Sequence, residues 1–360
     1  MNALTPHSSR FDEATRGKVR VFVVDDSSMI RAVYARVLGQ DLGIELVGSA
    51  SSAEDALAQL GSLHVHVVLL DLEMPGMGGM RALPEIIKRS NGAKVMVVST
   101  LTADGAEQTV QALSLGAADT LQKPAPGGFD DSYRAGLIER IKVLGKRPLR
   151  RSAGVEAPPI VMRHSTLKLR TRIVAIGAST GGIHALRALL GALPPQIGVP
   201  ILVTQHLPVA FLDAFARQLH ECSGRQTVIA ADGMEIAPDM IAVAPGNAHL
   251  CVERNGASSI VRLDTTPADN GCMPSVDPMF ASLAEQFGGH GLGVVLTGMG
   301  RDGTEGARAL VEAGGNVIVQ NEASSVVWGM PGSIAKAGLA SATLHPLDLA
   351  ARIFSSTHAS

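Results

Sequence analysis

The segment IVAIGASTGGIHALRALLGAL, residues 173–193, decides the fold of the second half of the chain. Its first four residues are apolar and mostly β-branched, which is typical of a buried strand, and they run directly into a glycine-rich turn. A stretch rich in leucine and alanine follows, as expected for a helix that packs on a sheet. The segment therefore predicts one strand–turn–helix unit of a parallel α/β fold.

The same alternation of strands and helices extends to both sides of this segment. Two segments, 249–253 and 259–263, can pair as an antiparallel hairpin across Asn255-Gly256, a strong turn signal. The pattern predicts an α/β protein of two domains: a flavodoxin-like (βα)5 domain, then a doubly wound, mostly parallel Rossmann-like domain with the added hairpin. Further strands are expected at residues 19–24, 44–47, 65–70, 94–98 and 119–121, and at residues 200–204, 227–230, 241–244, 292–297 and 317–320.

Composition and charge bound the domain organisation and the class of protein. Residues 146–168 contain three prolines and a basic cluster without aromatic or helical periodicity, which favours a solvated linker over a nucleic-acid patch. We therefore expect domains at residues 19–140 and 171–352, joined by a linker at 141–170. The net charge is -2 and the apolar runs are far shorter than the ~20 residues of a membrane helix. A cytoplasmic protein that neither binds nucleic acid nor inserts into a membrane is expected.

Three carboxylates follow two strands of the first domain. Asp25 and Asp26 come directly after one apolar run, and Asp71 after another. Residues just past the ends of parallel strands gather at the carboxyl edge of the sheet, so we expect these side chains to lie together. Carboxylates that are close together repel one another unless a cation lies among them, and hard oxygen ligands favour Mg²⁺.

The same edge offers the groups needed to accept a phosphoryl group. Asp71 can act as the nucleophile and form an aspartyl phosphate. Lys123, after the fifth strand, can neutralise the phosphoryl charge. Ser99 or Thr100, after the fourth, can donate a hydroxyl hydrogen bond to the phosphate. A single aspartate in such a place is more often a helix cap, but this combination favours phosphorylation.

The first domain resembles the receiver domain of two-component response regulators. The resemblance implies that a histidine kinase supplies the phosphoryl group to Asp71, and that Asp25, Asp26, Asp71 and the backbone of Glu73 bind Mg²⁺. Receivers often carry an aromatic residue three positions before the lysine, where this chain has Thr120, which lacks the ring of an aromatic rotamer switch. The matching motifs are VDDSSMIR, LLDLEMPGMGG, VVST and QKP.

Ser179 lies in a G-x-S-x-G pattern, residues 177–181, between a strand and a helix. Such a turn exposes the serine, and the helix N-terminus supplies free N–H groups that stabilise an oxyanion. The stretch could instead be a dinucleotide fingerprint. Ser179 replaces the second glycine of that fingerprint, however, and the next strand ends in Gln205-His206 without the expected acid. Nucleophilic chemistry is the better interpretation.

A base and an acid follow other strands of this domain. His206 ends the next strand and Asp302 lies in a glycine-rich loop after a later one. A serine, a histidine that takes its proton and an aspartate that orients the histidine form a hydrolytic triad, here in the chain order Ser, His, Asp. The α/β-hydrolase order would instead use His345. The other candidates for the base are His249, His290 and His358.

The second domain resembles the catalytic domain of chemotaxis protein-glutamate methylesterases, the CheB family. The resemblance implies hydrolysis of glutamate methyl esters on the cytoplasmic domains of chemoreceptors, with release of methanol, and deamidation of receptor glutamines. It implies Ser179 as nucleophile, His206 as base and Asp302 as orienting acid, with Thr180 and Met299 near the oxyanion and no cofactor for hydrolysis. The matching motifs are IGASTGG, QHLP, APGNAHL, PSVD, LTGMGRDG and QNEASSVVWGMPG.

Departures from the family and two rival functions stay open. The family often has a His-Arg pair before PSVD, where this chain has Cys272 and Met273. Cys222, Cys251 and Cys272 are too far apart in the sequence for a disulfide framework or a zinc motif. The rivals are a response regulator whose second domain only binds a partner, and a small-molecule esterase under phosphorylation control.

Overall fold

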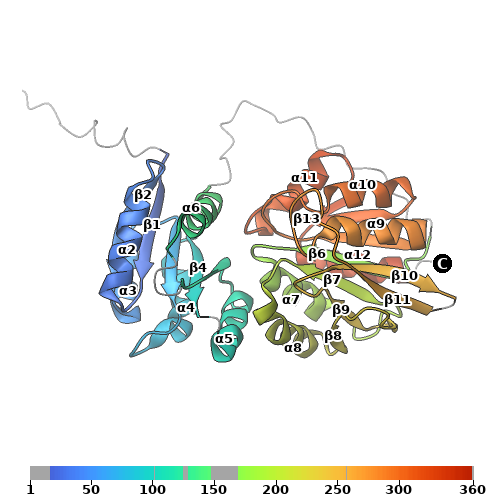
Figure 1. Ribbon diagram of the computed structural model, residues 1–360, viewed down its shortest axis with the longest axis horizontal. Coiled ribbons are helices and arrows are strands. Elements are labelled where there is room, and N and C mark those ends of the chain that lie inside the picture. Colours follow the sequence, from blue (N-terminus) through green and yellow to red (C-terminus); the bar gives the residue numbers. More distant parts are fainter. Residues whose placement is uncertain (1–16, 101, 125–128, 147–168, 257, 359–360) are drawn as a thin grey trace, which may run out of the picture. The chain divides into compact units, whose positions relative to one another are not determined.

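A computed structural model describes residues 17–100, 102–124, 129–146, 169–256 and 258–358 (Figure 1). The described residues form two compact units. The first takes residues up to 99 and from 120 to 146, and the second takes residues 100–119 and those from 169 onward. Most of the linker predicted at 141–170, residues 147–168, lies outside the described residues.

The first unit is built on a five-stranded sheet of order β2-β1-β3-β4-β5. The pairings of β1 with β2 and β3, and of β3 with β4, are parallel, which confirms the predicted flavodoxin-like fold. The strands are β1 (Val19–Val24), β2 (Ile44–Ala50), β3 (Val67–Asp71), β4 (Lys94–Ser99) and β5 (Asp119–Gln122), and the helices α2 (Ser28–Gly39), α3 (Ala53–Leu60), α4 (Gly78–Arg89) and α6 (Asp131–Gly145).

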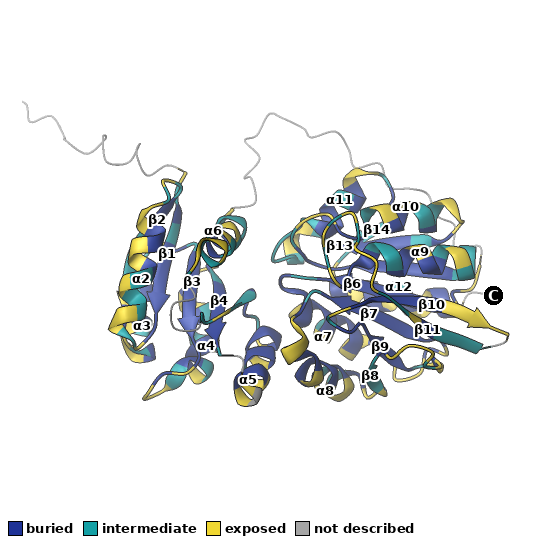
Figure 2. Ribbon diagram, viewed as in Figure 1, coloured by how far each residue is buried: buried dark blue, intermediate teal, exposed yellow. Residues whose placement is uncertain are grey.

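Local sequence explains where these elements begin and which faces they bury. The side chains of Ser27, Ser52 and Asp130 each accept a hydrogen bond from a backbone N–H in the first turn of the helix that follows. Every residue of β3 is buried, as expected for a central strand covered on both faces (Figure 2). The carboxyl end of β3, and with it Asp71, is therefore held in a rigid place.

The second unit contains a seven-stranded sheet of order β14-β13-β12-β6-β7-β9-β8, in which every pairing is parallel. The predicted hairpin is present as a separate antiparallel pair of strands, with Asn255 opposite Ser258. The strands are β6 (Ile173–Ala178), β7 (Ile201–Gln205), β8 (Thr227–Ile229), β9 (Ile241–Val243), β12 (Gly291–Val295), β13 (Asn316–Gln320) and β14 (Ala342–Leu344), with β10 (His249–Asn255) and β11 (Ser258–Asp264) in the hairpin.

Helices cover both faces of this sheet (Figure 1). One group packs α7 (Gly182–Ala192) against α8 (Leu212–Ser223) and α12 (Pro346–Thr357). The other packs α10 (Thr304–Glu312) against α9 (Val276–Phe287) and α11 (Met330–Lys336). Every residue of β6, β7, β9 and β12 is buried, whereas the edge strands β8 and β14 are only half-buried. Short 3-10 turns occupy Val209–Phe211, Gly288–His290 and Glu322–Ser324.

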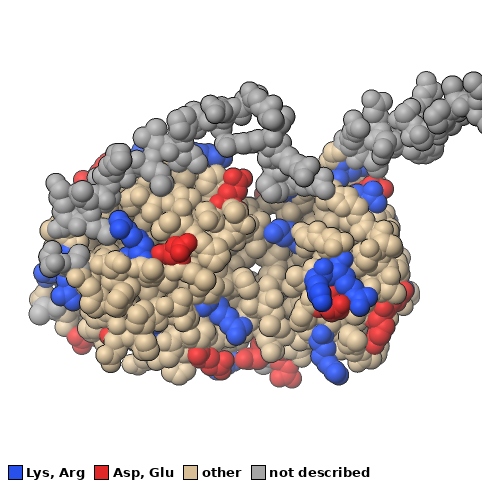
Figure 3. Space-filling model, turned by 180° about the vertical axis from the view of Figure 1, so that it is seen from behind, with Lys and Arg blue, Asp and Glu red and all other residues tan. Residues whose placement is uncertain are grey.

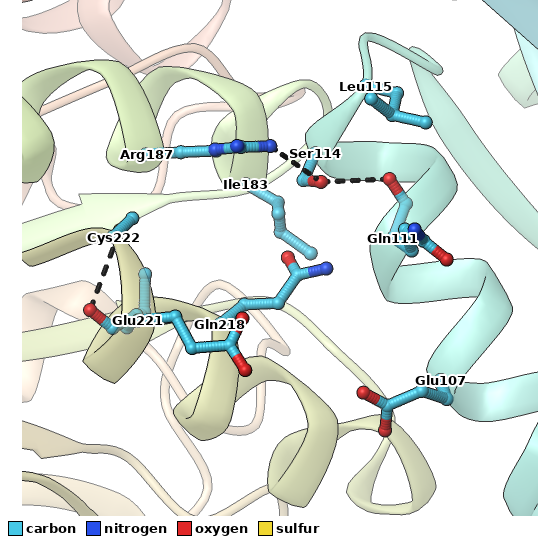
Figure 4. A pocket seen from close by; sticks show the side chains of 10 residues that line it. Glu107, Gln111, Ser114, Leu115, Ile183, Arg187, Gln218, Glu221 and Cys222 are labelled. Carbon is cyan, nitrogen blue, oxygen red and sulfur yellow. Dashed lines mark hydrogen bonds between the residues drawn. The ribbon is translucent and has the colours of Figure 1, made fainter.

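Helix α5 (Ala103–Ser114) belongs by its contacts to the second unit and packs against α7 and α8. A cavity of about 420 Å³ lies among these three helices, and Figure 4 shows Arg187 reaching Ser114 across it. The residues that line this cavity do not include the predicted nucleophile, base or acid.

Within the described part of the chain, every helix is too short or too polar to cross a membrane. Figure 3 shows the charged side chains of one face as small scattered groups of both signs.

Candidate functional site

The predicted nucleophile lies where the strand order of the second unit reverses direction. β6 is flanked by β7, the next strand in the chain, and by β12, a much later strand. Open α/β sheets bind ligands at the carboxyl ends of strands at such a switch point. Ser179 directly follows β6, His206 directly follows β7, and Asp302 lies in the loop after β12. The fold therefore brings the three predicted residues to one edge of the sheet.

Glycines make the turn around Ser179 possible. Gly181 has a φ of 76°, and a Cβ there would lie 2.5 Å from a methyl group of Val326. Gly298 lies against the serine itself, because a Cβ at this position would be 2.9 Å from the Cβ of Ser179 and 2.3 Å from the sulfur of Met330. These positions admit only glycine without movement of their neighbours. The loop after β12 thus approaches Ser179 at van der Waals contact.

The backbone of Ser179 is fixed while its hydroxyl is left available. Its N–H donates to the carbonyl of Thr297 at 3.1 Å, and its carbonyl accepts from the amide of Gln205 at 3.0 Å. Within the described residues, the Ser179 hydroxyl has no hydrogen-bond partner, and the residue is partly exposed. A rigid backbone with an unengaged, accessible hydroxyl is the arrangement that a nucleophile requires.

His206 is oriented by a hydrogen bond to a buried carboxylate. Its Nε2 lies 2.7 Å from Oδ2 of Asp302, and its backbone N–H donates to the carbonyl of Ala178, the residue before Ser179. An ionised carboxylate only accepts hydrogen bonds, so Nε2 carries the proton and Nδ1 of the neutral imidazole keeps its lone pair. Nδ1 has no partner within the described residues. It is therefore free to accept a proton.

Asp302 is held ionised by a dense set of donors. The residue is 2% exposed, and its burial by itself raises the pKa of the carboxyl. Hydrogen bonds from His206, Ser275 and Val276, together with the positive charge that His206 carries when it is protonated, outweigh burial and lower the pKa to about 2. The N–H groups of Asp277 and Gly303 also donate to Oδ1 of Asp302. This carboxylate is ready to stabilise a protonated His206.

Some of these donors to Asp302, here called the cradle of the acid, come from the N-terminus of α9, which the sequence analysis did not connect with Asp302. Ser275 caps the helix and donates its hydroxyl to Asp302 at 2.7 Å, and the first helical N–H, that of Val276, donates at 2.8 Å. A helix N-terminus carries free N–H groups and a partial positive charge that favour an anion. The serine of the PSVD motif therefore positions the carboxylate, and its N-cap pattern was the available signal.

Two further side chains complete the network behind Asp302. Asn270 donates to Oδ1 of Asp302 at 2.7 Å and to the carboxylate of Asp277 at 2.9 Å. His249 is 1% exposed; its Nδ1 accepts from the N–H of Ser275, and its Nε2 lies 2.9 Å from the carbonyl of Thr266. Burial raises the pKa of Asp277, and the nearby charge of Asp302 adds to this. Neither Asn270 nor His249 could be assigned this role from spacing alone.

The other histidines considered as bases lie in different surroundings. His345 caps α12 at the end of β14, an edge strand that the sequence analysis missed. His290 contacts the carbonyl of Arg170, and His358 that of Phe354. The half-buried run Ala342–Leu344 is too short to give a strand signal. The structure pairs Asp302 with His206 and with none of these described histidines.

Two backbone N–H groups beside the serine are unengaged. The N–H groups of Thr180 and Met299 find no acceptor among the residues that the structure describes. Thr180 is buried at the start of the turn into α7, and Met299 follows Gly298, which touches Ser179. Unpaired N–H groups beside a nucleophile are able to bind an oxyanion.

The predicted acidic cluster of the first unit is also brought together. Asp25, Asp26 and Asp71 each offer a carboxylate oxygen, and these oxygens all lie within 4.8 Å of one another. Asp25 and Asp71 are buried, and Oδ2 of Asp25 has no hydrogen-bond partner among the described residues. Burial, as the largest cause, raises the pKa of Asp25. A buried oxygen without a donor, in an all-oxygen cluster, fits Mg²⁺.

Two of the remaining residues of the predicted phosphorylation site, Lys123 and Glu73, contact Asp71. Nζ of Lys123 lies 2.5 Å from Oδ2 of Asp71, and the N–H of Glu73 donates to Oδ1 at 3.0 Å. Burial raises the pKa of Asp71 to about 6 although Lys123 and Glu73 oppose the shift. Ser99 is buried at the end of β4, and its carbonyl accepts from the N–H of Lys123. Thr100, the alternative hydroxyl, contacts Thr102.

Comparisons with known proteins find two families along the chain, and the receiver match includes residues 100–119, which group with the second unit by their contacts. Residues 174–353 match the family described as CheB methylesterase, and residues 21–128 match the response regulator receiver domain. A protein-glutamate methylesterase/protein-glutamine glutaminase of Rhodospirillum rubrum is 40% identical over 95% of this chain and 96% of its own length. A relative of the same description from Caulobacter vibrioides is 42% identical over 92% of this chain and 96% of its own.

Among solved structures, the CheB methylesterase catalytic domain of Thermotoga maritima is similar with a TM-score of 0.50 and 34% identity. The match covers 52% of this chain and 98% of that domain.

Proposed function

The chain belongs to the CheB family of protein-glutamate methylesterases/protein-glutamine glutaminases, and from this premise we propose that it hydrolyses methyl esters of glutamate side chains on chemoreceptors. Methanol is released, and receptor glutamines are deamidated to glutamate by the same site. The observation that carries the proposal is the His206–Asp302 pair beside an unengaged Ser179 at one edge of the sheet. Phosphorylation of Asp71 controls this activity.

In the proposed reaction Ser179 attacks the ester carbonyl carbon. Nδ1 of His206 takes the hydroxyl proton, while Asp302 holds Nε2–H and stabilises the imidazolium that forms. The carbonyl oxygen becomes an oxyanion, and the N–H groups of Thr180 and Met299 donate to it. His206 then returns the proton to the leaving methoxide, so methanol departs and an acyl-serine remains.

A water molecule completes the proposed cycle. His206 accepts a proton from the water, which attacks the acyl carbon and releases the glutamate carboxylate and the Ser179 hydroxyl. With a glutamine side chain the first leaving group is ammonia instead of methanol, and the same second step gives glutamate. Each step uses this chain's side chains, its backbone N–H groups and water.

We also propose that residues 19–140 are the regulatory receiver, 141–170 the linker and 171–352 the catalytic domain. A chemosensory histidine kinase donates the phosphoryl group to Asp71 in the cytoplasm, where the receptor cytoplasmic domains are also found. Asp25, Asp26, Asp71 and the backbone of Glu73 would hold Mg²⁺, which neutralises phosphoryl charge when bound. Lys123 pairs with the carboxylate of Asp71, and Ser99 supplies the hydroxyl that donates a hydrogen bond to the phosphoryl group.

The test is methanol release from methylated receptor membranes by the full chain. Wild type and Ser179→Ala are compared, each with and without a small phosphodonor and Mg²⁺. We expect release from wild type alone, increased by the phosphodonor, and labelling of Ser179 by a fluorophosphonate. Hydrolysis of short esters without release from receptors would favour a small-molecule esterase. A chain with neither activity nor labelling would instead be a binding module.

A further inference from the structure

The thiol of Cys272 lies beside the His206–Asp302 pair, and the proposed reaction does not use it. Cys272, His206 and Asp302 each offer one ligand atom, and the three atoms all lie within 4.8 Å of one another. They come from three separate loops, so the grouping is invisible in the sequence. A thiolate, an imidazole and a carboxylate are together the ligand types that zinc prefers. We propose that Cys272, His206 and Asp302 bind Zn²⁺ and that zinc thereby inhibits hydrolysis reversibly.

The dimensions of the cluster suit one zinc ion. Zinc lies about 2.3 Å from sulfur and about 2.0–2.2 Å from nitrogen and oxygen, so two ligands at a tetrahedral angle are about 3.3–3.7 Å apart. Ligand atoms that all lie within 4.8 Å of one another differ from this separation by at most about an ångström. Three protein ligands leave the fourth position to water, as in other zinc sites that are open to solvent.

The backbone holds Cys272 near the other two ligands. Its N–H donates to the side-chain oxygen of Asn270 at 2.8 Å, and the amide of Asn270 donates to Asp302 at 2.7 Å. The loop is thus tied to the carboxylate that completes the site. The Cys272 thiol has no hydrogen-bond partner within the described residues, and the residue is partly exposed, so an ion can reach it from solvent.

The charge around the thiol favours a cation. Burial raises the pKa of Cys272 to about 11, and the carboxylates of Asp302 and Asp277 contribute. Without a metal, the thiol is therefore favoured over the thiolate. A bound divalent cation reverses this preference: the Zn–S bond forms as the thiol proton leaves to solvent.

Zinc at this position removes the base. The Nε2–Oδ2 distance of 2.7 Å is shorter than the separation of two zinc ligands, so a metal that uses both atoms must break that hydrogen bond. The proton of Nε2 then moves to Nδ1, which no longer has a lone pair for the serine proton. A metal that binds Nδ1 instead occupies the lone pair that accepts the serine proton. Inhibition therefore rests on the proposed role of His206, whereas metal binding itself does not.

The experiment measures binding and hydrolysis separately on the full chain. Excess Mg²⁺ is present to saturate the acidic cluster of the first unit. Zn²⁺ affinity is measured by competition with a chromophoric chelator, and Co²⁺ is used as a probe because a thiolate ligand adds a charge-transfer absorption. Methanol release is then titrated with Zn²⁺. The variants are Cys272→Ser and, as a matched control, Cys222→Ser, which removes another partly buried thiol.

We expect Cys272→Ser to weaken zinc binding at least about tenfold, since even the loss of an outer-shell partner costs 10–100-fold. The variant should also lack the cobalt–thiolate absorption band. The zinc concentration that halves methanol release should be higher for the variant than for wild type, by the same factor as the loss of zinc affinity. Cys222→Ser should behave as wild type. Equal affinities in wild type and Cys272→Ser would overturn the site, and zinc bound through Cys272 without loss of hydrolysis would overturn the inhibition. If the zinc-free chain releases no methanol, the proposed function fails while the binding measurements still judge the metal site.

Discussion

Replacing Asp302 by asparagine tests whether this carboxylate sets the tautomer of His206. Oδ1 accepts from four donors, on Asn270, Ser275, Asp277 and Gly303, and Oδ2 accepts from Val276 N–H and His206. The amide oxygen of asparagine should therefore take the position with four donors and leave NH₂ facing His206. An amide donor there favours the tautomer in which Nε2 accepts a hydrogen bond and Nδ1 carries the proton. Nδ1 then has no lone pair with which to accept the proton of Ser179.

The expected loss follows from this change of tautomer and of charge. The base must act from its unfavourable tautomer, and no carboxylate stabilises the imidazolium. In a serine protease triad the same substitution lowers kcat about 10⁴-fold, so we expect a loss of about 10³–10⁴-fold, or about 4–5.5 kcal/mol of transition-state stabilisation. The NH₂ group also faces the N–H of Val276, which leaves a buried donor unpaired at a stability cost of about 1–3 kcal/mol.

The assay is methanol release at saturating receptor and phosphodonor, with kcat and KM determined separately and folding checked by circular dichroism. Asp277→Asn is the matched control, because Asp277 shares Asn270 with Asp302 but makes no described contact with His206. We expect kcat of this control to stay within about tenfold of wild type. If Asp302→Asn keeps kcat within tenfold of wild type, or if both variants lose activity equally, the reasoning about the tautomer is wrong.

Three further outcomes are expected. Burial raises the pKa of Asp71 from 3.8 to about 6, so the folded state binds the carboxyl proton more tightly than the unfolded state does. The stability that this proton contributes is fully present below pH 4 and is lost as pH rises through 6. Asp71→Asn in Mg²⁺-free buffer should therefore stabilise the first unit at pH 7 by up to about 3 kcal/mol and flatten its calorimetric pH dependence; an unchanged transition would contradict this. Gly181→Ala should lower the thermal midpoint and kcat, because φ at this residue is 76° and the new methyl group meets Val326 at 2.5 Å. Gly224→Ala is the control: its φ is 66° but no neighbour lies within 4 Å, so it should cost only about 1 kcal/mol of folding stability. Equal losses would refute the role of the close contact. Asn270→Ala should lower kcat with little change in KM, because Asn270 positions Asp302 without contacting the substrate; a change in KM alone would show a different role.

Much of the fold follows from local properties of the sequence. Period-2 and buried apolar runs mark most strands, and the pair Asn255-Gly256 marks the hairpin turn, because these signals depend on neighbouring residues alone. The edge strand β14 escaped notice because three half-buried residues carry too little pattern. The grouping of α5 with the second unit could not be predicted from the sequence either. It depends on contacts of α5 with α7 and α8, which are distant from it in the sequence.

The sequence by itself also determined which residues stand at strand ends. Since parallel strands share one carboxyl edge, this was enough to place Ser179, His206 and Asp302 together, and likewise Asp25, Asp71 and the lysine that follows β5. Which atoms touch was decided only by the tertiary structure.

The direction of α9, for example, turns its N-terminal N–H groups onto Asp302, and the loop before this helix places Cys272 beside His206. Side-chain proximity across loops depends on how helices and strands cross in space. Local periodicity carries no record of that crossing, and so the cradle of the acid and the candidate zinc ligands became visible only in the folded chain.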